Sequence, residues 1–164
     1  MIDWSAVEID DEHIAALRSL LQGDPGASEK YASGTDDAAA SGYTMVIYSA
    51  FAVAVRRRFS PKYTHAQLAR YVADLRISLG ADASQINPRV AESMMRAALG
   101  DETLKDHEPY GADLSTMVVA ELAILDDLAQ GAELDDLLNE AADHAHRWLA
   151  AERAKQAAGV AADG

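Results

Sequence analysis

Residues 38–55 read AAASGYTMVIYSAFAVAV, and Arg56-Arg57-Arg58 follows directly. The stretch carries no charged side chain, and residues 45–55 are strongly apolar over about three helical turns. Apolar residues fall on nearly every face of this helix, which predicts that other helices surround it. We therefore expect a buried central helix over approximately residues 36–59, ended by Pro61.

An uncharged stretch of this length that ends in basic residues also has the outline of a membrane span. It contains no Leu, however, and polar residues such as Ser41, Thr44 and Ser49 interrupt it. A core helix is therefore the preferred interpretation. The N-terminal sequence MIDWSAVEIDDEH lacks the basic and apolar regions of a signal peptide. We predict a cytoplasmic protein with no membrane partner.

Helical spacing of apolar residues recurs on both sides of this stretch, and no strand pattern appears. The sequence Thr64-His65-Ala66-Gln67 fits a capping box, and Asn87-Pro88 fits an N-cap followed by proline at the first helical position. Residues 23–35 are a Gly/Pro/Ser-rich connection with room for one short helical turn, and residues 101–112 are a polar loop. The further helices are expected over about 9–22, 64–79, 88–99, 113–130 and 133–157.

The predicted fold is all-α: a single-domain bundle of about six helices around the central one, spanning residues 1–158 with a frayed tail at 159–164. The composition agrees, since 164 residues with 49% hydrophobic and 25% charged side chains suit one soluble domain. Cysteine is absent, which excludes disulfides, thiol nucleophiles and Cys-based metal centres.

The charges are strongly segregated along the chain. Residues 56–100 contain eight bases and three acids, net +5, whereas residues 1–55 are net −7 and residues 101–164 are net −11. The overall charge of −13 argues against a surface built as a whole for nucleic acid or anionic lipid. Two bases have local partners at helical spacing, in Arg70–Asp74 and Glu92–Arg96. The concentrated remainder, hereafter the basic patch, is Arg56, Arg57, Arg58 and Lys62.

The basic patch has an internal and an external interpretation. Acidic flanks of the same chain could neutralise it, and arginines in the last turn of a helix also suit the helix dipole. Alternatively, it meets an acidic protein surface, including that of a second copy. We predict a non-enzymatic protein-interaction or regulatory module, self-associating, with Arg56, Arg57, Arg58 and Lys62 as its partner-binding residues.

Two alternatives remain open. Residues 64–99 form helix, loop and helix with bases on both sides, which is compatible with a helix-turn-helix-like nucleic-acid-binding regulator; the eight-residue connection is longer than usual. Glu140 and His144 share a helix face, which could supply half of a metal site in a metal-dependent helical-bundle enzyme. No catalytic motif appears, and we predict no catalytic residue, metal ligand, cofactor or small-molecule ligand. The late acidic pair Asp126-Asp127 is expected at a solvated edge or beside the arginines.

Overall fold

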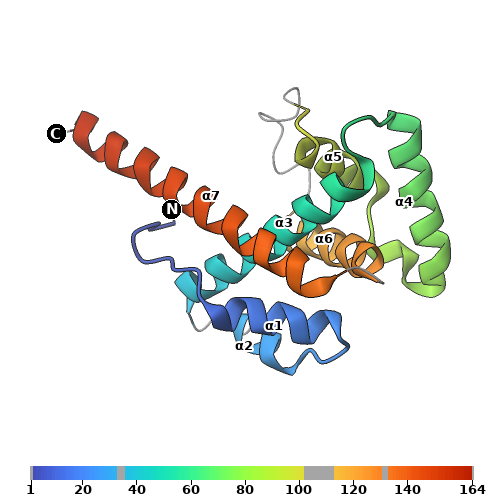
Figure 1. The fold of residues 1–164 in the computed structure, drawn as a ribbon, viewed down its shortest axis with the longest axis horizontal. Coiled ribbons are helices and arrows are strands. Elements are labelled where there is room, and N and C mark those ends of the chain that lie inside the picture. The colour runs from blue at the N-terminus through green and yellow to red at the C-terminus, as the bar shows by residue number, and fades with distance from the viewer. Residues whose placement is uncertain (1, 33–35, 102–112, 131–132, 164) are drawn as a thin grey trace. The chain divides into compact units, whose positions relative to one another are not determined.

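The computed structural model describes residues 2–32, 36–101, 113–130 and 133–163. Regular structure in these ranges consists of seven α-helices and one 3₁₀ helix, with no strand among them (Figure 1). The predicted all-α bundle class is confirmed. The chain divides into two compact units, Met1–Ala50 with Glu133–Gly164, and Phe51–Ala132. The extent of the predicted single domain, 1–158, stays a prediction.

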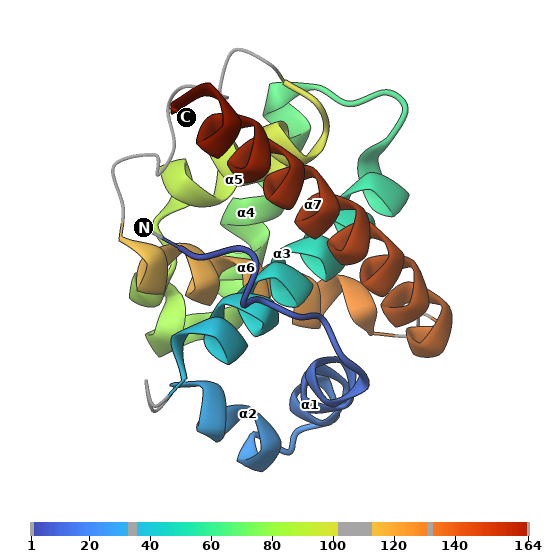
Figure 2. The ribbon, with the colours of Figure 1, turned by 90° about the vertical axis from the view of Figure 1, so that its left-hand side faces the viewer.

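The first unit contains α1 (Asp11–Leu21), α2 (Gly26–Ala32), the first part of α3 (Asp37–Phe59) and α7 (Leu134–Asp163). α1 packs against α2 and against α7, and Figure 2 shows α1 and α2 side by side. Leu17, Val46 and Leu138 are fully or almost fully buried. Apolar side chains from helices far apart in the sequence therefore form this core.

The second unit contains the end of α3, α4 (His65–Leu79), the 3₁₀ helix η1 (Gly80–Gln85), α5 (Pro88–Ala98) and α6 (Leu114–Ala129). α4 packs against η1 and α5, and α6 packs against α5 and η1. Leu68, Met94 and Ile124 are at most 1% exposed. These packed helices hold the basic end of α3.

The central helix lies where the sequence predicts it, over Asp37–Phe59. Every residue from 45 to 55 is buried except Tyr48, which is half-buried. α3 is the helix of the described chain that is long and apolar enough to cross a membrane, and 67% of its most apolar window is buried by protein. Such burial is typical of a core helix. The cytoplasmic location stays a prediction.

The predicted caps are confirmed in atomic detail. Thr64 Oγ1 accepts the Gln67 N–H at 3.1 Å, and Gln67 Oε1 accepts the Thr64 N–H at 2.8 Å. Asn87 Oδ1 accepts the N–H groups of Arg89 and Val90, with Pro88 at the first helical position. These side chains satisfy amides that have no partner within the helix.

Two helices differ from the sequence prediction. The connection at 23–35 contains the seven-residue helix α2, more than the single turn we expected. α7 does not end near Ala157: it continues through Gly159 to Asp163, so most of the predicted frayed tail is helical. The alanines on both sides of Gly159 favour the helix more than one glycine weakens it. Residues 102–112 of the predicted polar loop lie outside the described residues.

Candidate interaction site

The basic patch lies in the second unit, at and just beyond the last turn of α3. Arg56, Arg57, Arg58 and Lys62 are all exposed, whereas Phe59 between them is 9% exposed. One buried aromatic residue thus anchors the turn while the cationic side chains around it face solvent. The last turn of a helix has unsatisfied carbonyl groups, so three arginines are electrostatically favourable here.

Arg56 has an internal role that the sequence did not reveal. Its Nε donates a hydrogen bond of 2.8 Å to the carbonyl oxygen of Ala98, the last residue of α5. The bond therefore caps the C-terminal end of α5 with a guanidinium from α3. This bond gives Arg56 a partner within the chain, but the acceptor is a backbone carbonyl of the basic segment and not an acidic side chain of the flanks.

Arg58 borders an aromatic pair. Its guanidinium carbon lies 5.4 Å from the centroid of the Phe59 ring, and the Tyr71 ring from α4 meets Phe59 edge-on at 5.4 Å. The Tyr71 hydroxyl donates a 2.6 Å hydrogen bond to Asp127 Oδ2 of α6. Burial is the largest cause that raises the pKa of Tyr71, the bond to Asp127 raises it further, and the positive charge of Arg58 lowers it.

Asp127 therefore has a specific partner, which the sequence did not identify. Asp126 and Asp127 are both exposed, as a solvated helix edge requires. The predicted proximity of this acidic pair to the arginines is indirect, since Tyr71 interacts with both Asp127 and the charge of Arg58. This contact leaves the basic patch exposed on its solvent side.

Neither local ion pair expected nearby, Arg70–Asp74 or Glu92–Arg96, forms among the described residues. Arg96 Nη2 and Nε instead donate to Asp101 Oδ2, at 2.7 and 3.1 Å. Asp101 follows Gly100 past the end of α5, and its side chain is only 14% exposed.

The helix-turn-helix alternative depends on α5 as a reading helix. Within α5 only Arg89 is exposed, together with the capping Asn87, and Glu92, Ser93 and Arg96 are half-buried. The remaining side chains pack against the second unit, including Val90, Met94 and Met95. A recognition helix that reads DNA presents a row of polar side chains to the major groove. α5 offers few of them.

Of the two residues in the metal hypothesis, Glu140 is exposed and His144 contacts a serine. His144 Nδ1 lies 2.8 Å from Ser49 Oγ of α3, within the first unit. The described residues contain no group of three or more potential ligands that could hold a metal ion. A serine–histidine pair is also the core of a hydrolytic site, but Ser49 has no exposed surface, so a substrate has no access to its oxygen.

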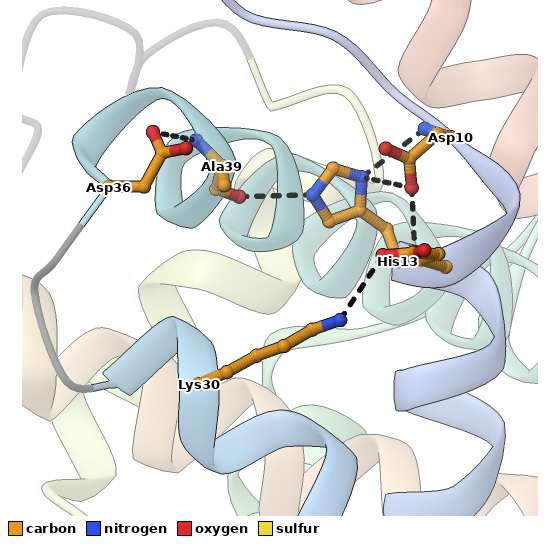
Figure 3. Close-up of polar contacts among 6 residues, drawn as sticks. Asp10, His13, Lys30, Asp36 and Ala39 are labelled. Carbon is orange, nitrogen blue, oxygen red and sulfur yellow. Dashed lines mark hydrogen bonds and ion pairs between the residues drawn. The ribbon is translucent and has the colours of Figure 1, made fainter.

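The sequence could not have identified the Ser49–His144 pair, because 95 residues separate its members. A second buried polar cluster surrounds His13, whose ring lies among α1, α2 and α3 (Figure 3). No pattern in the sequence predicts that the groups around His13 meet. Both clusters lie in the first unit.

Comparison with known proteins identifies no relative: no family model, no curated protein and no solved structure matches this chain.

Proposed function

We propose that the protein is a non-enzymatic interaction module that binds an acidic protein surface through the basic patch, and that a second copy of the chain is one such surface. The observation that carries this proposal is the exposure of four cationic side chains around the buried Phe59. A cluster of exposed like charges on a packed helical support raises the association rate of an oppositely charged partner.

The partner's chemistry follows from the charge of the whole chain. At −13, the protein repels the dense negative charge of a nucleic acid wherever its acidic segments come near. An acidic patch of limited area on a folded protein can contact the basic patch without facing the acidic segments of this chain. The acidic flanks of this chain, net −7 and net −11, make a second copy a suitable partner.

Charge reversal tests the proposal while Arg56 is kept, because Arg56 also caps α5. The test variant is Arg57→Glu/Arg58→Glu/Lys62→Glu. The control, Arg70→Glu/Arg89→Glu/Arg147→Glu, changes the net charge equally at exposed positions outside the patch. Sedimentation velocity at low and high salt reports self-association, and fluorescence anisotropy reports binding to labelled poly-L-glutamate and to duplex DNA.

We expect the wild type and the control to self-associate and to bind poly-L-glutamate at low salt, and the test variant to lose both. Equal behaviour of the two variants, or monomers at every salt concentration without poly-L-glutamate binding, would refute the proposal. Salt-dependent binding to duplex DNA that exceeds binding to poly-L-glutamate would favour the nucleic-acid alternative instead.

A further inference from the structure

His13 is a buried titratable side chain for which the proposed interaction has no use. It is 2% exposed and occupies the third position of α1, one turn after the N-cap Asp10. Its Nε2 lies 3.0 Å from the carbonyl oxygen of Ala39 in the first turn of α3. Its Nδ1 lies 3.2 Å from the backbone N–H of Asp10 (Figure 3).

These two bonds specify one form of the ring. A carbonyl oxygen can only accept, so Nε2 carries a proton; the Asp10 amide can only donate, so Nδ1 is a bare lone pair. With the Asp10 amide as donor, these two bonds match the neutral Nε2–H tautomer. A cationic ring has N–H groups at both positions, and its Nδ1 cannot accept the Asp10 N–H.

The ring has little room to move away. A Cβ atom at Gly42 of α3 would lie 2.9 Å from His13 Cε1, so the helix backbone already contacts the imidazole. Tyr31 of α2 and Tyr43 of α3 place their ring centroids 5.0 and 6.3 Å from that of His13. Protonation must therefore be accommodated by a change of hydrogen-bond partner.

A replacement acceptor is already adjacent. Asp10 Oδ1 lies 3.3 Å from His13 Nδ1, and the same oxygen accepts the His13 backbone N–H at 3.2 Å. The Asp10 side chain is 54% exposed and the His13 side chain 3%. The carboxylate can thus bind an imidazolium without becoming buried. The charged and titratable groups of the surrounding elements are Glu8, Asp10, Asp11 and Glu12 before and at the start of α1, Glu29, Lys30 and Tyr31 of α2, and Asp36, Asp37 and Tyr43 at the start of α3. The helix α7 also packs against α1, where Asp135 pairs with Arg18 further along α1.

We propose that His13 is a pH-sensitive switch at the start of α1, which exchanges its bond from the Asp10 amide for an ion pair with the Asp10 carboxylate when the ring is protonated. The bond to Ala39 is kept in both forms, because Nε2 is protonated in each. Acidification therefore releases the backbone amide that closes the capping box while α1 and α3 stay joined.

A second capping box in the same chain suggests a matched control variant for His13. In the capping box of α4, Gln67 occupies the position equivalent to His13 and accepts the Thr64 N–H through an amide oxygen that does not titrate. His13→Gln should likewise accept the Asp10 N–H at every pH. Asp10→Asn keeps an N-cap oxygen but removes the carboxylate to which the cationic ring would turn.

The test follows the imidazole nitrogen shifts of His13 and the exchange protection of the Asp10 amide by NMR, from about pH 7.5 to about pH 5.5, where histidine charge ordinarily changes. We expect the Nε2–H tautomer at the upper limit. As the ring protonates, protection of the Asp10 amide should fall about fivefold, the equivalent of one hydrogen bond. In His13→Gln the protection should not change with pH, and in Asp10→Asn the ring should protonate at lower pH than in the wild type.

The wild-type tautomer alone can refute the switch, whatever the variants do. An Nδ1–H tautomer at the upper limit contradicts the bonding pattern. A ring that stays neutral throughout, a ring that protonates while Asp10 stays protected, or an equal fall in His13→Gln would each overturn the proposal.

Discussion

The first and last turns of α3 differ in where their polar groups lie. At the first turn they bind other groups of the chain, and at the last turn the charged side chains are exposed to solvent. At the first turn, Asp36 accepts the Ala39 N–H at 3.1 Å and His13 binds the Ala39 carbonyl at 3.0 Å. At the last turn, Arg56 makes one bond to Ala98, and its side chain and those of the next two arginines are exposed.

This difference suggests that the first turn of α3 mainly serves folding and the last turn mainly serves binding. A buried polar group that loses its partner is costly, so the first turn is restricted to side chains that fit their partners. Exposed charges contribute little to stability, and their solvent-facing side is accessible to other molecules. Substitutions at the first turn should therefore change the free energy of unfolding, and substitutions at the last turn should mainly change binding.

The largest effect is expected at Gly42, near the start of α3. A Cβ atom there would lie 2.5 Å from the Glu8 carbonyl oxygen, so Gly42→Ala forces backbone apart and should destabilise the fold by about 2–3 kcal/mol. Gly159 of α7 has nothing within 4 Å of its Cβ position. Gly159→Ala should stabilise by about 0.5–1 kcal/mol through helix propensity. Urea denaturation measures both, and a Gly42→Ala protein as stable as the wild type would contradict the packing described at the first turn.

A second comparison uses Tyr43 near the start of α3 and Tyr71 of α4, which contacts Phe59 at the end of α3. Burial raises the pKa of Tyr43, and burial together with the bond to Asp127 raises the pKa of Tyr71 more strongly. Because the folded state holds both phenols neutral, their contribution is fully present below the ordinary tyrosine pKa of about 10 and is lost as the pH rises above it. Urea midpoints between about pH 8 and 11 should fall less in Tyr43→Phe than in the wild type, and least in Tyr71→Phe. An identical alkaline loss in all three proteins would show that neither phenol is held neutral.

The smallest stability effects are expected in the basic patch, where they distinguish its members. Arg56→Ala removes the bond to the Ala98 carbonyl and should destabilise by about 1 kcal/mol. Lys62→Ala removes an exposed charge and should stay within about 0.5 kcal/mol of the wild type. Thermal denaturation of the two variants measures this difference. Equal losses would mean that the bond from Arg56 contributes nothing to the fold.

Local sequence signals predicted the helices well, and the physical reason is that caps and apolar spacing act over a few residues. Thr64 with Gln67, and Asn87 with Pro88, mark helix starts that the structure confirms. α2 has only seven residues and no strong apolar repeat, so its pattern was too short to recognise. The extension of α7 depends on alanine propensity, which predicts no end point.

The contacts of the candidate sites were less accessible to sequence. The exposure of the basic patch could be predicted from the sequence, because four cationic side chains within seven residues are costly to bury. The partners of Arg56 and His13 are backbone carbonyl groups, which every residue possesses and which no side-chain pattern reveals. Tyr71–Asp127 and Ser49–His144 join side chains 56 and 95 residues apart. Their pairing is decided by helix packing, which a single sequence does not specify.

The central claim, that the basic patch binds acidic protein surface, is tested most directly by the arginine Nε–Hε NMR signals during titration with poly-L-glutamate. Our account predicts that Arg57 and Arg58 shift most, that Arg56 shifts less because its Nε–H is already bound to Ala98, and that Arg70 and Arg89 stay near their starting positions. Shifts spread evenly over all arginines, or no shifts at low salt, would contradict it.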